Sequence, residues 1–253
     1  MIIRETDQHF VMTTQHEHAN FSSKIARGFA EQLFIDSEFI TDVLIAIQEH
    51  DRSWIRLDDT PTWNDRNSVP FSFVDYPLLP KLALYKLGLD EVEEMNEYAA
   101  LLCSLHYTSF KHIQRSKVTD GIEFIKNEAR RQKRLKAKLG FPQEEMIMAH
   151  FRLLQLCDEI SLYVCMNNPG VAKENEHPWY KEGFETTIGE QKVNAYWLSS
   201  SDIFIKPLLF ENETTATIKM KYVMKDLINR VGIATAYKDT DFTEQEVVFR
   251  VHT

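Results

Sequence analysis

The chain has 253 residues, 43% of them hydrophobic and 26% charged, with a formal net charge of −9 at pH 7. This composition is ordinary for a globular protein of one large or two smaller domains, and its acidity argues against general binding to nucleic acid or to an anionic membrane. No apolar run approaches the roughly 20 residues that span a bilayer, and no secretory signal is visible at the N-terminus. The sequence therefore predicts a cytoplasmic protein. Free, buried thiols are expected at Cys103, Cys157 and Cys165.

A short strand or hairpin followed by a series of helices is predicted for the first 172 residues. Residues 1–14 are rich in β-branched and aromatic side chains without helical spacing. From His18, apolar residues recur every four positions, the period of an amphipathic helix, at Phe21, Ile25, Phe29 and Leu33, with Ala26 and Ala30 alongside. The same criteria predict further helices at 37–50, 77–88, 90–110 with Asp90 as its N-cap, 119–140 and 142–166.

The last eighty residues or so have a different pattern. Strand-like segments separated by turn residues occur at 184–198, 202–210, 214–224 and 244–253. We place a boundary near residue 172. The predicted fold is mainly α: an HD-like helical bundle with a short N-terminal strand at 1–172, and a smaller β-rich C-terminal region at 173–253 packed on it, α+β overall.

Several histidines and aspartates are candidates for a metal or catalytic site, and each also has an ordinary structural interpretation. They are His16, His18, His50, Asp51, His106 and Asp158. The first two open the first helix, where solvated caps are common. His50 and Asp51 end the second helix, where the helix dipole also favours a histidine. His106 lies on an apolar helix, as many core histidines do. Asp158 lies among apolar residues, where a carboxylate needs a cation or hydrogen bonds as partner.

The chain order of these residues resembles the H…HD…D signature of the HD superfamily of metal-dependent phosphohydrolases, which is built on a helical bundle. HANFSSKIARGFA (18–30) looks like the first metal-ligand helix of that superfamily. LLQLCDEISL (153–162) is similar to its final segment, in which a ligand Asp lies between apolar residues. One departure weakens the expected phosphate handling: an apolar residue, Gly and Lys commonly follow the HD doublet, but Arg52, Ser53 and Trp54 follow it here.

A narrower similarity covers nearly the whole chain, including the β-rich end. It rests on TQHEHANFSSKIA (14–26), EHDRSW (49–54), YAALLCSLHYTSF (98–110) and LLQLCDEISLYV (153–164). These segments look like an uncharacterised bacterial family, domain of unknown function 3891, which is HD-like. The similarity implies a fold and carries little knowledge of function.

The resemblance to the HD superfamily implies a metal site shared by several helices. The implied metal ligands are His18, His50, Asp51 and Asp158. Such a set suits a divalent transition metal, Mn²⁺, Fe²⁺, Co²⁺, Ni²⁺ or Zn²⁺. The implied catalytic residues are His106, Asp51 and His16, with the histidines as second-metal ligands, general acids or donors to phosphate oxygens.

The implied activity is hydrolysis of a small phosphorylated molecule or nucleotide, which is an anionic substrate. Two alternatives stay open: a non-catalytic metal- or ligand-binding regulatory module, and a helical protein-interaction scaffold. The sequence does not predict an oligomeric state.

Two further segments also have two interpretations each. The long segment 52–76 is either a lid over a pocket or a connection whose aromatic residues pack. The basic run EARRQKRLKAK (128–138) either guides an anionic substrate or is a solvated helix face.

Overall fold

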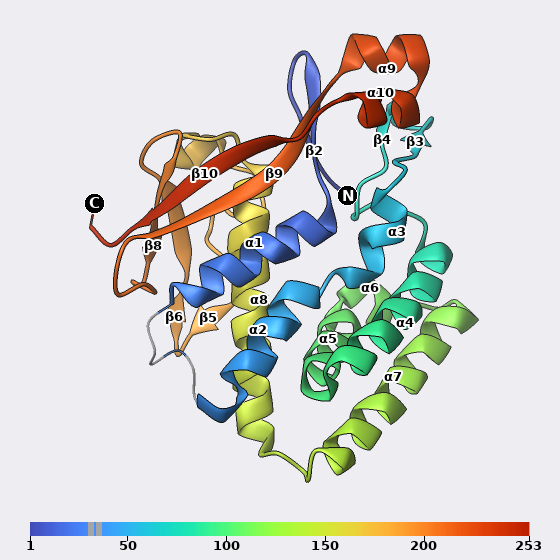
Figure 1. Ribbon diagram of the computed structural model, residues 1–253, viewed down its shortest axis with the longest axis vertical. Coiled ribbons are helices and arrows are strands. Elements are labelled where there is room, and N and C mark those ends of the chain that lie inside the picture. The colour runs from blue at the N-terminus through green and yellow to red at the C-terminus, as the bar shows by residue number, and fades with distance from the viewer. Residues whose placement is uncertain (30–32, 34–36, 253) are drawn as a thin grey trace.

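The computed structural model describes residues 1–29, 33 and 37–252, in which a group of helices packs against a curled sheet (Figure 1). The helices are α1 (Gln15–Arg27), α2 (Ile40–Glu49), α3 (Ile55–Asp58), α4 (Leu78–Met95), α5 (Glu97–Ser109), α6 (Lys111–Gln114), α7 (Thr119–Lys138), α8 (Glu144–Met166), α9 (Lys225–Val231) and α10 (Ile233–Asp239), with 3-10 turns η2 (Ser37–Phe39), η3 (Arg52–Trp54) and η4 (Lys173–Asn175). None of these helices has the length and apolarity that crossing a membrane requires. The strands are β1 (Ile2–Glu5), β2 (His9–Thr13), β3 (Trp63–Asn64), β4 (Val69–Pro70), β5 (Thr187–Ile188), β6 (Gln191–Lys192), β7 (Asn194–Trp197), β8 (Asp202–Lys206), β9 (Thr214–Met224) and β10 (Thr243–Arg250).

A six-stranded sheet joins the two ends of the chain in the order β1-β2-β9-β10-β8-β7. Only β8 and β10 run parallel; the other neighbours in this sheet are antiparallel. β2 pairs with β9 in a register that places His9 opposite Met224. The N-terminal strand or hairpin is thus confirmed, and the sheet contains strands from both sides of residue 172. The fold is mixed α+β, while the HD-like bundle and the two-domain division stay predictions.

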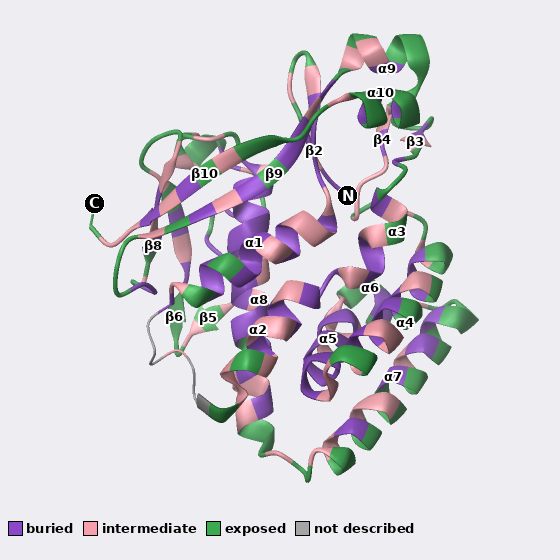
Figure 2. Cartoon of the chain, in the orientation of Figure 1, coloured by how far each residue is buried: buried purple, intermediate pink, exposed green. Residues whose placement is uncertain are grey.

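A large apolar cluster holds α1, α2, α5 and α8 against the sheet, and a second, smaller cluster joins β2 and β9 to α9 and α10. Phe21 of α1 packs on Phe249 of β10, with ring centroids 6.3 Å apart. Buried residues of α2, α5 and α8 belong to the same cluster, and Figure 2 shows α5 and α8 as largely buried. The cysteines are free and buried, as predicted. This packing brings α1, α2, α5 and α8 together.

The first helix starts beside His16, as predicted, and ends earlier than predicted. It begins at Gln15, because the Thr14 side chain accepts a hydrogen bond from the Glu17 backbone N–H and caps it. It ends at Arg27, and Phe29 instead forms an isolated β-bridge with Phe210. The predicted continuation through Phe29 is therefore wrong. The next expected helical residue, Ala30, lies outside the described residues.

The helix start predicted at Asp90 is also wrong. α4 continues to Met95, and Asn96 ends it by taking an extended backbone conformation. The Asn96 side chain then caps α5 by accepting from the Ala99 N–H at 2.8 Å. Asp90 lies inside α4, where its carboxylate pairs with Arg131.

The structure describes the two segments that have two interpretations each, residues 52–76 and the basic run 128–138. Residues 52–76 contain η3, α3 and the β3–β4 hairpin, and Trp54 is buried against Tyr76 and Tyr85. For Trp54 the packing interpretation therefore holds. The basic run lies on α7, where Arg131 and Arg134 pair with acidic residues of α4. These ion pairs link α7 to α4, so for Arg131 the interpretation as a solvated helix face or substrate guide does not apply.

Candidate metal centre

Five of the six candidate residues meet where α1, α2, α5 and α8 pack together. His18 lies on α1, His50 and Asp51 at the C-terminal end of α2, His106 on α5, and Asp158 in the middle of α8. In Figure 1, α1 and α2 cross α8, which both of them contact. The first four residues are buried, whereas 16% of the Asp158 side chain remains exposed. The group is therefore enclosed by helices and reaches solvent beside Asp158.

Four side-chain atoms of this group converge on one point. His18 Nε2 lies 2.9 Å from Asp158 Oδ1 and 3.3 Å from His50 Nε2. His50 Nε2 lies 3.5 Å from the same Asp158 oxygen and 3.6 Å from Asp51 Oδ2. Asp51 Oδ2 is 3.9 Å from His18 Nε2. An ion bound about 2.0–2.2 Å from its ligands separates neighbouring ligand atoms by about 3–3.5 Å. The four atoms therefore have a spacing close to that of ligands around one ion.

Hydrogen bonds on the outer side of each imidazole direct its Nε2 lone pair into the group. His50 Nδ1 lies 2.7 Å from the Ile47 carbonyl oxygen. Because a carbonyl only accepts, His50 Nδ1 carries the proton and Nε2 of the neutral ring presents a lone pair.

Ser161 contacts the outer nitrogen of the His18 ring, as the Ile47 carbonyl does for His50. Its hydroxyl donates to the His18 carbonyl oxygen at 2.9 Å, and its oxygen lies 2.6 Å from His18 Nδ1. With the ring proton on Nδ1, where the Ser161 oxygen can accept it, His18 Nε2 would be free to ligate an ion in place of its hydrogen bond to Asp158. Outer partners that orient a ring in this way are typical of metal-binding histidines.

These residues fit a divalent cation. Two imidazole nitrogens and two carboxylate oxygens face one another in a buried group, where little water is present to solvate them. One cation would satisfy all four atoms. A set that mixes imidazole with carboxylate suits Mn²⁺, Fe²⁺, Co²⁺, Ni²⁺ or Zn²⁺.

The raised pKa of His50 agrees with a site that attracts positive charge. Burial opposes a charged His50 ring, but the carboxylates of Asp51 and Asp158 prevail and raise its pKa to about 9. Burial raises the pKa of Asp51 to about 7. Although burial also opposes ionisation of Asp158, hydrogen bonds from His18 and His50 hold its pKa well below the usual range. Burial lowers the pKa of His18.

His106 lies beside the four converging atoms. Its Nε2 is 3.9 Å from Asp158 Oδ2, and its ring meets His50 edge-on with centroids 5.1 Å apart. Burial lowers its pKa to about 3. The Nδ1 atom is buried, and no described residue forms a hydrogen bond with it. His106, His50 and Asp158 also form a second group with the spacing of metal ligands.

The structure does not bring two other residues into the group. His16 belongs to neither set of potential ligands found among the described residues, and two positions along a helix turn it about 200° away from His18. Arg52 donates to Glu49 at 3.1 Å and to Glu91 at 2.8 Å. It is therefore engaged away from the four atoms.

Sequence reasoning did not assign Ser161 to the site. It lies three residues after Asp158 and so on the same side of α8. A small hydroxyl one turn from a candidate ligand was the available signal.

Replacing Ser161 by Ala is expected to lower the affinity for a divalent ion by about 10–100-fold, because His18 loses the partner that sets its proton and ring orientation. Ser22→Ala is the matched control: Ser22 donates to the same His18 carbonyl at 3.1 Å and has no bond to the ring. A competition titration with a coloured chelator measures both variants. Equal affinities would refute the orienting role.

The chain belongs to the family described as "Protein of unknown function (DUF3891)", whose family model matches residues 1–225. This confirms the family inferred from the sequence, whereas its HD-like character and bacterial origin stay predictions. The matched range contains all five residues of the group. A search of curated proteins found no match, and a search of solved structures found none either.

Proposed function

We propose that this protein is a divalent-metal-dependent phosphohydrolase with an HD-like helical core, which acts on a small phosphorylated molecule or nucleotide. One observation carries the proposal: side-chain atoms of His18, of the His50–Asp51 doublet and of Asp158 lie together, with five of their six separations between 2.9 and 3.9 Å. Their residues follow one another along the chain in the order H…HD…D. The phosphohydrolase reaction itself rests on the resemblance to the HD superfamily.

Each residue has a definite role in this proposal. His18, His50, Asp51 and Asp158 would hold the ion, which when bound would lower the pKa of a coordinated water and polarise a phosphoryl oxygen. The surrounding helices exclude bulk water on every side except that of Asp158. His106 stands beside the second Asp158 oxygen, where its N–H could donate to a phosphate oxygen or to the leaving group.

The decisive experiment combines metal analysis with an activity screen. Purified protein is expected to contain, or to take up, one or two equivalents of Mn, Fe, Co, Ni or Zn, and to hydrolyse a member of a nucleotide and phosphomonoester panel. Asp51→Ala is expected to lose at least about a hundredfold in kcat/KM, because it removes a ligand. Asp59→Ala, which changes an exposed carboxylate of the same segment, is the control. Failure to bind metal, or full activity of Asp51→Ala, would overturn the proposal.

A second candidate is a metal-binding regulatory module without hydrolytic activity. The engagement of Arg52 by Glu49 and Glu91 favours it, because the cation nearest the doublet in sequence is then unavailable to a phosphate. Stoichiometric metal with no hydrolysis across the panel would support this candidate.

A further inference from the structure

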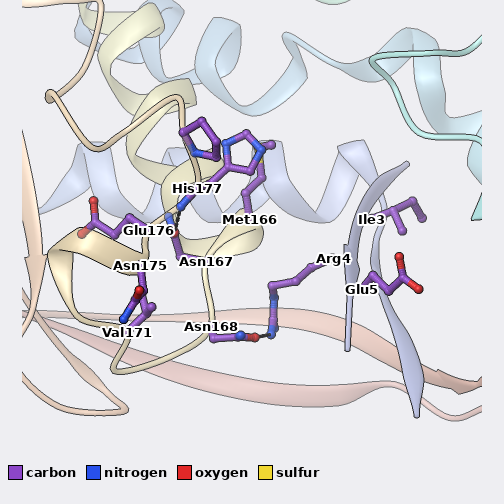
Figure 3. Close-up of a pocket in the computed structure, with 11 residues that line it drawn as sticks. Ile3, Arg4, Glu5, Met166, Asn167, Asn168, Val171, Asn175, Glu176 and His177 are labelled. Carbon is purple, nitrogen blue, oxygen red and sulfur yellow. Dashed lines mark hydrogen bonds between the residues drawn. The ribbon is translucent and has the colours of Figure 1, made fainter. Parts of the chain in front are cut away.

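A second site is formed where β1 faces the loop that follows α8. A pocket of about 330 Å³ lies there, open to solvent (Figure 3). Its lining is mostly polar and includes Arg4, Glu5, Asn167, Asn168, Glu176 and His177. None of these residues belongs to the metal centre.

Arg4 is the notable member of this lining, because its guanidinium is nearly buried without a carboxylate partner. The residue is 8% exposed. Its Nε donates to the Cys165 carbonyl at 3.2 Å, and one terminal nitrogen donates to Asn168 Oδ1 at 2.6 Å. Figure 3 shows the side chain reaching from β1 to Asn168. Among the described residues, no carboxylate forms an ion pair with it.

The two carboxylates of the lining are engaged elsewhere. Glu5 pairs with Lys225 at 2.7 Å. Glu176 accepts hydrogen bonds from the Tyr163 hydroxyl and from Lys173, both at 2.7 Å. Neither negative charge is therefore available to Arg4.

The C-terminal end of α8 compensates part of the Arg4 charge. Cys165 belongs to the last turn of this helix, whose dipole places roughly half a negative charge there. A nearly buried guanidinium carries a whole charge and five N–H groups, of which two are used by the neutral acceptors. The remaining N–H groups are not enclosed by protein, so they are available to water or to an anion in the pocket.

Neutral donors surround this charge on a well-fixed loop. The Asn167 side chain donates to the Tyr163 carbonyl at 2.9 Å and accepts from the His177 backbone N–H at 2.7 Å. The His177 Nδ1 accepts from the Trp179 N–H, so its Nε2 carries the proton and is a donor. The Asn168 amide nitrogen is a further donor, since its oxygen accepts from Arg4.

We propose that this pocket binds a small organic anion, whose carboxylate or phosphate group pairs with the Arg4 guanidinium. The planar fork of an arginine suits both groups. The site is distinct from the metal centre and does not depend on the proposed function. Cys165 and Asp158 lie seven residues apart on α8, which is about 10 Å along the helix axis.

Calorimetric titration of the full chain with inorganic phosphate, and separately with malonate, tests this site. At least one probe is expected to bind, and the one that does identifies the group recognised. Arg4→Gln is expected to weaken binding by about tenfold or more, because a charge-assisted fork is lost. Arg134→Gln, a change of an exposed arginine on α7, is expected to bind as wild type does.

Two further variants keep the result interpretable. Asp51→Ala must leave the binding unchanged, because loss of binding would place the anion at the metal centre and overturn the proposal. His177→Ala removes a partly exposed ring and is expected to weaken anion binding several-fold. It replaces Arg4→Gln as the test of the pocket if Arg4→Gln does not fold. Absence of binding for both probes, or equal affinity of the wild type and the folded pocket variants, would also refute the site.

Discussion

Asp158→Asn is expected to lose its divalent ion while the fold is retained. One oxygen of Asp158 lies 2.9 Å from His18 Nε2 and 3.5 Å from His50 Nε2, so this atom is shared by both imidazoles. An asparagine has nearly the same shape, but it is neutral and can turn a donor towards the two lone pairs. Because loss of an outer partner alone costs about 10–100-fold in affinity, loss of this ligand should cost more than about a hundredfold.

Glu159→Gln provides the matched control on the same helix. The Glu159 carboxylate accepts from the backbone N–H groups of Glu185 and Thr186 at 2.7 and 2.9 Å, so it is engaged outside the metal group. This variant should keep the wild-type metal content, measured by elemental analysis after gel filtration. Retention of metal by Asp158→Asn would remove Asp158 from the ligand set.

Removing the ion gives an independent measurement of the same site. A ligand present at about 100–1,000 times its Kd stabilises the folded state by about 3–4 kcal/mol. A chelator should therefore lower the free energy of unfolding of the wild type by roughly this amount. It should have little effect on Asp158→Asn, which has already lost the ion.

The candidate site could be predicted largely from the sequence because its residues are distinctive in type and order. A His–Asp doublet at a helix end and an Asp among apolar residues suggested ligands, and the structure brings both to one point. Helical spacing could not decide which side of α1 faces α8, and therefore could not separate His18 from His16. The hydrogen bonds of Ser161 likewise depend on the packing of α8 against α1.

The kinds of secondary structure in each part of the chain were predictable from the sequence, but the pairing of strands that are distant in sequence was not. Turn residues and alternating segments indicated the strands near the C-terminus, and the N-terminal hairpin was recognisable. Its pairing with β9 is a contact between the two ends of the chain, which local patterns do not encode. The break at Asn96 was missed because Asp90 is an equally good cap in sequence. Inside α4, the Asp90 carboxylate instead pairs with Arg131.

Arg131→Met is expected to lower the free energy of unfolding by about 3–5 kcal/mol, the cost of leaving a buried ion-pair partner alone. Arg131 contacts Asp90, Glu93 and Glu128. The cost comes mainly from Glu128, which is 2% exposed and, among the described residues, would keep only the Ser104 hydroxyl as partner. Urea denaturation measures it.

Arg134→Met is the control on the same helix. The Arg134 side chain is 53% exposed and pairs with Glu93, so its loss should cost less than about 1 kcal/mol. Similar losses in both variants would contradict the central role of Glu128.

The pH dependence of Arg131→Met separates an unpaired charge from a packing defect. Burial raises the pKa of Glu128, and Arg131 opposes this rise, so the variant should raise the pKa further. A carboxyl with a raised folded-state pKa binds its proton more tightly when folded than when unfolded. Stability therefore increases as the pH falls through that raised value towards the ordinary range of glutamate. The deficit relative to wild type should therefore shrink as the pH falls from above the raised pKa towards the ordinary range of glutamate. A deficit independent of pH would indicate lost packing of the arginine stem instead.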